Sequence, residues 1–148
     1  MGNDLLFDSK IIRVSNAVAA GTSDVNCTAV DMSDCEGVLF LAAFGTLTAN
    51  QVTQIYAQED DVVGMGNAAN LTGTIVGPLA DNASNKCLAL AIHRPLKQFC
   101  RCVVDRGTAN AVIDAVFAIK YGMKWKPAAA DATLYAAETH VYEIAGTP

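Results

Sequence analysis

The sequence predicts an all-β domain, or a β-rich domain with a short helix, folded as a β-sandwich or jelly-roll-like unit of about seven to eight short strands. Three observations predict this class. Strand-like segments recur between turn residues, the pattern typical of sandwiches, jelly rolls and small barrels. The 148 residues are 52% hydrophobic, enough for one large core. Only 17% are charged, which excludes a chain disordered throughout.

The N-terminal residues predict an arm, 1–12, ahead of a single sandwich domain, 13–148. Residues 1–9 combine acidic residues with a small apolar cluster, so they fit an arm, a first strand or both. The next segment, 10–20, is rich in β-branched residues and predicts a strand that ends at Gly21. The first residues lack the basic and apolar stretches of a secretion signal, so we expect none.

The middle of the chain predicts six short strands separated by turn residues. They cover 25–30, 38–44, 51–58, 71–76, 87–93 and 99–104. The segment 38–44 is a continuous apolar run, which predicts a strand buried on both faces. Pro95 separates the last two strands, because proline cannot donate a hydrogen bond to a strand ladder.

The last third of the chain leaves two assignments open. Residues 111–121 have helical propensity, but their β-branched and aromatic content favours a strand. The alanine-rich segment 128–139 fits a short helix or an irregular lid, and 140–144 predicts a last short strand. Trp125 lies between two lysines, and it fits either an anchor of an interface or a side chain that closes the base of the sandwich.

Charge is unevenly distributed along the sequence. Residues 1–85 hold two basic and ten acidic side chains, whereas residues 86–126 hold eight basic and two acidic ones. In one interpretation the acidic and basic side chains pair on the surface of one sandwich. In the other, the two charged regions are complementary between copies of the protein or to the surface of a partner. Specific binding of nucleic acid is not expected, because the net charge is −5 and the basic segment lacks interleaved aromatic side chains.

The five cysteines and the acidic cluster 59–61 have structural explanations that we prefer to metal binding. Cys100 and Cys102 would point to the same face of a strand and are poorly placed to form a disulfide with each other. We interpret the cysteines as small buried apolar residues; the alternative is a zinc site with His93 or His140. The acidic cluster predicts a solvated turn, with a calcium site as the alternative.

Nothing in the sequence predicts catalysis. The segment 64–69 matches a dinucleotide-binding pattern, but a predicted strand follows it where that motif requires a helix. The chain has no phosphate-binding Walker pattern and no Gly-x-Ser-x-Gly. Its longest apolar run, 38–44, is too short to cross a membrane as a helix. We therefore expect no enzyme, no cofactor, no metal ion and no membrane partner.

Several short segments resemble a family of small virion proteins of tailed bacteriophages. They are 14–22, 30–32, 35–40, 44–45, 81–86, 93–95, 104–108, 131–133 and 138–141. The resemblance extends over roughly residues 11 to 146 and rests on these pieces together.

The resemblance implies a non-enzymatic structural protein of the virion, assembled in the host cytoplasm. Within the virion it implies a capsid cement, or decoration, protein on the outside of the expanded shell. Its partners would be the major capsid protein and further copies of itself, as a homotrimer. A head–tail connector or tail component is the alternative within the virion. A β-sandwich module that binds carbohydrate is the alternative of another class.

Nine residues are candidates for contact with the capsid or with another subunit. The proposed arm contributes apolar side chains, the basic segment contributes cations that would face acidic groups of a neighbour, and the tryptophan is a candidate anchor. They are Leu5, Leu6, Phe7, Ile11, Arg94, Lys97, Arg101, Arg106 and Trp125.

Overall fold

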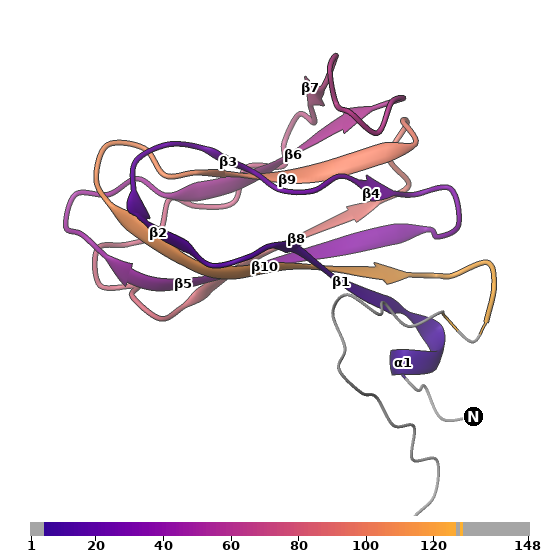
Figure 1. Ribbon diagram of the computed structural model, residues 1–148, viewed down its shortest axis with the longest axis horizontal. Helices are drawn as coiled ribbons and strands as arrows, with labels where there is room; N and C mark the ends of the chain where they lie inside the picture. Colours follow the sequence, from indigo (N-terminus) through magenta and orange to yellow (C-terminus); the bar gives the residue numbers. More distant parts are fainter. Residues whose placement is uncertain (1–4, 127, 129–148) are drawn as a thin grey trace, which may run out of the picture.

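The computed structural model describes residues 5–126 and 128, and in these residues two antiparallel sheets pack face to face (Figure 1). Sheet A has the order β1-β10-β5-β8, with β2 also paired to β10. Its strands are β1 (Lys10–Ser15), β2 (Val18–Gly21), β5 (Gly37–Leu47), β8 (Cys87–His93) and β10 (Ala111–Tyr121). The predicted β-sandwich is therefore confirmed.

Sheet B has the order β3-β9-β6-β7, with β4 also paired to β9. Its strands are β3 (Val25–Asn26), β4 (Val30–Asp31), β6 (Gln54–Asp60), β7 (Ala69–Asn70) and β9 (Phe99–Asp105). A short helix, α1 (Leu5–Asp8), precedes β1.

The strand order is that of a jelly roll. Two strand positions are each filled by a pair of short strands: β1 and β2 both pair with β10, and β3 and β4 both pair with β9. The ten strands therefore occupy eight positions along the chain. The first pairs with the eighth, the second with the seventh, the third with the sixth and the fourth with the fifth. Folding this long antiparallel ribbon onto itself produces two four-position sheets, as in jelly rolls.

The structure corrects several predicted boundaries. Pairing with β10 begins at Lys10, so residues 10–12 belong to sheet A and not to an arm. The predicted strand 10–20 is divided at residues 16–17 into β1 and β2, and a register shift between Arg13 and Ser15 precedes this break. The predicted strand 71–76 is wrong: only Val76 forms a bridge, with Ile55, because the chain turns at Gly73, where φ is +80°. The predicted strand 140–144 and most of the segment 128–139 lie outside the described residues.

The core lies between the two sheets and follows the two-residue period of the strands. β5 and β10 contribute Phe40, Phe44 and Ile113 from sheet A, while Ile55 and Val104 face them from sheet B. All five side chains are fully buried. The prediction that 38–44 is buried on both faces is wrong, because alternate residues of β5 are only half-buried on the outer face of sheet A.

The outer faces of the two sheets differ in chemistry. Sheet B presents polar side chains, including Gln54, Gln58, Arg101 and Asp105. Sheet A presents mostly aliphatic, aromatic and small side chains. In register across its strands they are Ile11, Leu39, Leu41, Ala89, Ala91, Phe117 and Ile119. Arg13 lies beside them, over the Phe117 ring at 5.6 Å from its centroid.

Arg106 ties the two sheets together at the turn after β9. Its side chain is only 5% exposed and donates hydrogen bonds to the carbonyl oxygens of Ser23 (2.7 Å), Ala19 (2.7 Å) and Ala111 (3.1 Å). A Cβ on Gly21 would lie 2.9 Å from the guanidinium, so a larger residue there would push Arg106 away from these carbonyl groups. The expectation that Arg106 faces a neighbouring molecule is therefore wrong, because its donors serve backbone carbonyls inside the fold.

Replacing Arg106 should destabilise the fold strongly. Arg106→Ala leaves three carbonyl acceptors without their donor, and we expect the free energy of unfolding to fall by about 3 kcal/mol. Arg106→Lys should recover little of this loss, because an ammonium cannot reproduce the planar fork of donors. Urea denaturation measures both variants. Arg101→Ala, on the polar outer face of sheet B, is the control, and an equal loss there would contradict the role given to Arg106.

Candidate docking surface

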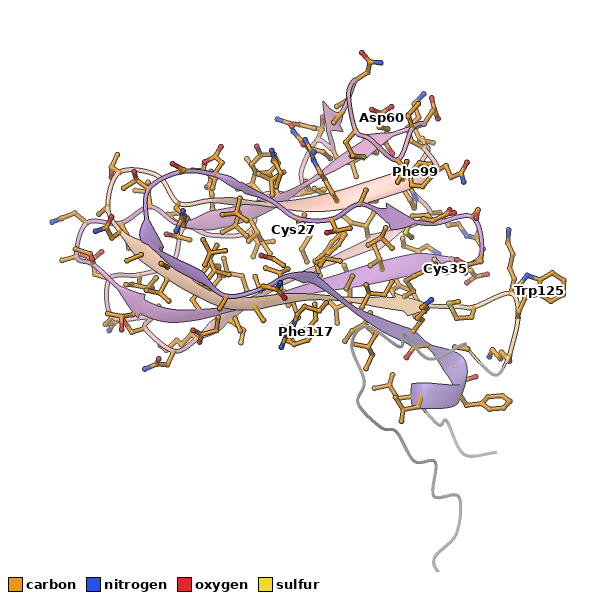
Figure 2. The ribbon with its side chains drawn as sticks, in the orientation of Figure 1. Cys27, Cys35, Asp60, Phe99, Phe117 and Trp125 are labelled. Carbon is orange, nitrogen blue, oxygen red and sulfur yellow. The ribbon has the colours of Figure 1, made fainter. Side chains whose placement is uncertain are left out.

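One end of the sandwich, which we call the loop end, is formed where β6, β8 and β10 finish and β5 and β9 begin. The strand pairs Asp60–Phe99, Gly37–His93 and Gly37–Tyr121 mark this end. Figure 2 shows Asp60, Phe99, Cys35 and Trp125 together there. The loops of this end contain most of the residues expected to contact a partner.

Exposed apolar side chains gather at the loop end. Seven large hydrophobic residues are exposed among the described residues, and five belong to this end: Leu5, Val62, Val63, Leu96 and Trp125. Leu96 is 91% exposed and Trp125 is 77% exposed. Exposed apolar groups concentrated in one region mark an interaction surface more often than scattered ones do.

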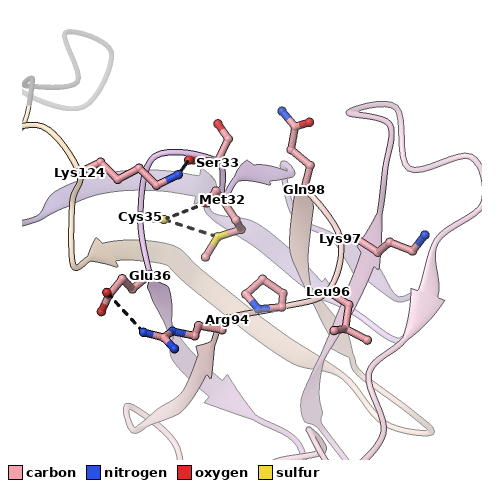
Figure 3. Close-up of a pocket in the computed structure, with 10 residues that line it drawn as sticks. Met32, Ser33, Cys35, Glu36, Arg94, Leu96, Lys97, Gln98 and Lys124 are labelled. Carbon is pink, nitrogen blue, oxygen red and sulfur yellow. Dashed lines mark hydrogen bonds and ion pairs between the residues drawn. The ribbon is translucent and has the colours of Figure 1, made fainter.

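A pocket of about 450 Å³ opens beside Leu96, between the loop before β5 and the loop after β8 (Figure 3). Met32 and Cys35 lie on one side, where the thiol is 3.9 Å from the Met32 sulfur. Arg94 and Glu36 form an ion pair at 3.6 Å along another side. The pocket combines an apolar floor with a charged rim.

Arg94 adopts an unusual backbone conformation at this pocket, with φ of +51°. This left-handed conformation is unfavourable for a residue with a side chain. The Arg94 N–H donates to the Glu36 carbonyl at 2.8 Å, which continues the β5–β8 ladder one pair beyond His93. The sharp turn that follows leads the chain into Pro95 and presents Leu96 to solvent.

Two buried carboxylates hold the loops of this end. Glu59 accepts the N–H groups of Leu96 at 3.0 Å and Lys97 at 3.2 Å, so β6 fixes the loop that carries Leu96. Asp60 accepts the N–H groups of Asn67 (2.8 Å), Val62 (3.3 Å) and Asp61 (2.7 Å) and holds the loop that carries Val62 and Val63. These hydrogen bonds, that from Asn67 first, lower the pKa of Asp60 below its usual value.

The acidic cluster 59–61 therefore has structural partners. Glu59 and Asp60 accept backbone hydrogen bonds, and Asp61 forms an ion pair with Lys97. Within the part of the chain that the structure describes, no group of three or more His, Cys, Asp or Glu side chains is arranged to hold a metal ion.

All four ion pairs of the described residues join a base from 86–126 to an acid from 1–85. They are Arg94–Glu36, Lys97–Asp61, Lys120–Asp34 and Lys126–Asp8. The interpretation that the two signs pair on one sandwich is thus confirmed for these residues. Lys120 is the buried member of the set, with its ammonium reaching Asp34 from inside the sandwich.

The helix α1 lies at the same end of the molecule. Its residues Leu5 and Asp8 line a second pocket, of about 330 Å³, together with Tyr121, Gly122 and Lys126. Ala128 donates its N–H to the Phe7 carbonyl at 2.9 Å. The candidates Leu5, Leu6 and Phe7 are thus brought close to the segment that carries Trp125.

Six of the nine candidate contact residues lie at the loop end: Leu5, Leu6, Phe7, Arg94, Lys97 and Trp125. Ile11 lies on the outer face of sheet A. Arg101 lies on the outer face of sheet B, where it donates to Gln58 at 2.8 Å. Trp125 is exposed, so the alternative in which it closes the base of the sandwich is wrong.

Sequence reasoning missed Leu96, Val62 and Val63. Each is a large apolar residue inside a turn rather than in a strand, next to Pro95 and Lys97 or to Asp61 and Gly64. An apolar residue that no strand can bury is the signal that would have identified them.

Four of the five cysteines are buried, as the sequence interpretation expects, and Cys87 is exposed. Cys27, Cys100 and Cys102 belong to the core. Burial raises the pKa of the Cys100 thiol to about 12. A hydrogen bond with Cys27, followed by burial, raises the pKa of Cys102. Cys100 and Cys102 are therefore neutral thiols of the core.

The chain matches no protein-family model, and comparison with curated proteins finds no significant match. Across residues 5–126 and 128, no helix has both the length and the apolar character needed to cross a membrane.

Acid should weaken the loop that Asp60 holds. Because the pKa of Asp60 is lower in the folded chain than in the unfolded chain, its stabilising effect is complete above pH about 4 and is lost as the pH falls through the lowered value. The difference in unfolding free energy between the wild type and Asp60→Asn should therefore shrink below pH 4. Urea denaturation at several pH values measures it. A difference between the two proteins that does not change with pH would contradict this role of Asp60.

Proposed function

We propose that this protein is a non-enzymatic structural component of a tailed-phage virion. In this proposal it is a capsid cement protein that binds the outside of the expanded shell through its loop end. The observation that carries the proposal is the cluster of exposed apolar side chains at that end, led by Leu96 and Trp125. Together with the resemblance noted above, it favours the major capsid protein as the partner, with the protein located on the virion exterior.

The loop end has the properties of a preformed contact surface. Three of its five exposed apolar residues, Leu96, Val62 and Val63, lie on turns that are hydrogen-bonded to β6 through Glu59 and Asp60. Docking would then cost little ordering entropy. Arg94 and Lys97 line the pocket beside Leu96 and add exposed charges there, with 72% and 47% of their side chains exposed.

The jelly-roll topology is compatible with this role. Jelly rolls occur in viral capsid proteins and in lectins, so the fold alone supports both the virion role and the carbohydrate-binding alternative. A carbohydrate site needs aromatic rings that form a platform. Trp125 is the one aromatic residue among the exposed large apolar side chains of the described residues, which favours the virion role.

Many copies of a weakly bound protein can stabilise a shell through the sum of their contacts. The homotrimer implied by the resemblance belongs to this proposal, with copies around threefold positions of the shell. A connector or tail component would instead be present in few copies per particle.

Copy number separates these roles. Quantitative mass spectrometry of purified virions should give a ratio of this chain to the major capsid protein near one, on the order of one cement subunit per shell subunit. A few to a few tens of copies per particle would favour the neck or tail, and absence from the virion would overturn the structural role.

Removing the apolar anchors should weaken binding to the shell. We expect Trp125→Ala to lower the affinity for expanded capsids that lack this protein by about thirtyfold, and Leu96→Ser by about tenfold, because apolar anchors dominate such contacts. Co-sedimentation with capsids measures the binding. Ile75→Ser removes another exposed apolar side chain, 63% exposed and away from the loop end, and should leave binding unchanged. Equal losses for all three variants would contradict the assignment of the loop end.

A further inference from the structure

The strand β8 forms one edge of sheet A, and its outward backbone groups have no partner among the described residues. The Lys86 carbonyl accepts the Phe44 N–H at 3.0 Å, and the Arg94 N–H donates to Glu36 at 2.8 Å. Hydrogen-bonded positions alternate along an antiparallel strand, so the even-numbered residues of β8 bond to β5. The N–H and C=O groups of the odd-numbered residues therefore point away from the sheet. These residues are Cys87, Ala89, Ala91 and His93, and their side chains are exposed.

The other sheet edges of the described residues are protected against pairing. On sheet B, β3, β4 and β7 have only two residues each. At the opposite edge of sheet A, β1 carries Lys10 and Arg13 and is interrupted by a register shift. Short strands, charges and bulges are the usual means by which proteins prevent edge-to-edge association. By contrast, β8 has seven residues, no charged Asp, Glu, Lys or Arg, no proline and a continuous register with β5.

We propose that two copies of the free protein pair through β8, antiparallel about a twofold axis centred on Leu90. In this register Ala89 lies opposite Ala91 of the other copy, and Cys87 lies opposite His93. All four outward residues of each copy then exchange backbone hydrogen bonds, and sheet A continues into the sheet of the second copy.

The second copy is favoured as the occupant because β8 is complementary to itself. Its inward side chains, Leu88, Leu90 and Ile92, are all aliphatic and are arranged symmetrically about Leu90. Its central outward side chains are both alanine, so neither copy presents a bulky or charged group to the other. The apolar outer face of sheet A then runs without interruption across both copies.

The charges at the ends of β8 give this contact a characteristic salt dependence. In the proposed register Lys86 approaches Arg94 of the other copy, and Arg94 is already paired with Glu36. The nearest charges across the contact therefore repel weakly. Raising the salt concentration should strengthen the association or leave it unchanged, opposite to a contact held by ion pairs.

This inference is independent of the proposed virion role, and it is tested on the purified full-length chain without capsids. Sedimentation velocity over a range of concentrations should show a monomer–dimer equilibrium. Ala89→Lys/Ala91→Lys places like charges opposite each other and should raise the dissociation constant at least about tenfold. Ala20→Lys/Thr46→Lys adds the same charge at two exposed strand positions of sheet A and should not change it. Circular dichroism checks that each variant is folded.

A crosslink tests the register itself. In Ala89→Cys/Ala91→Cys with Cys87→Ser, each new cysteine faces one from the other copy, while the two in one strand are too far apart to bridge. Mild oxidation should give a covalent dimer on a non-reducing gel. Ile11→Cys with Cys87→Ser, at the opposite edge of sheet A, should give none. A chain that stays monomeric to about 100 µM, a dimer insensitive to the lysine pair, or failure of the crosslink would each overturn the proposal.

Discussion

The ladder between β5 and β10 is the contact on which the rest of the structure depends. Both strands have eleven residues and they are neighbours in the middle of sheet A. Their inward side chains, among them Phe40, Phe44 and Ile113, fill the space against sheet B. Their outer neighbours, β1 and β8, pair with them and add Val14, Leu90 and Ile92 to the same core. This ladder joins the third and eighth strand positions, so it forms only after the chain has folded back on itself.

Buried polar side chains fix the loops at the two ends of the sandwich. At the turn after β9, Arg106 satisfies three backbone carbonyls and links the two sheets. At the loop end, Glu59 and Asp60 satisfy backbone N–H groups of two exposed loops. Each of these side chains would be costly to bury without partners, and each is repaid by several hydrogen bonds. The loops that expose Leu96, Val62 and Val63 are therefore held by hydrogen bonds to β6.

Much of the fold could be predicted from the sequence, because strands such as β8 and β9 follow from local patterns that end at turn residues or proline. For β10 the sequence favoured a strand but left a helix open. The register shift after Arg13 and the turn at Gly73 could not be predicted, because bulges and turns depend on which strands become neighbours. The same limit applies to side chains. Arg94 and Arg106 look alike as surface cations in the sequence. Only the folded structure shows that the first lines a pocket and that the second is buried.

The loop end and the β8 edge impose different symmetries on any assembly. Antiparallel pairing of β8 turns the loop ends of the two copies in opposite directions, so both cannot rest on one shell surface. The pairing would therefore belong to the free protein, and docking on a capsid would separate the copies. The Ala89→Lys/Ala91→Lys variant should therefore bind capsids at least as well as the wild type. The wild-type dimer must separate before it docks, whereas the variant is already monomeric. Weaker binding by this folded variant would show that the β8 edge itself contacts the shell.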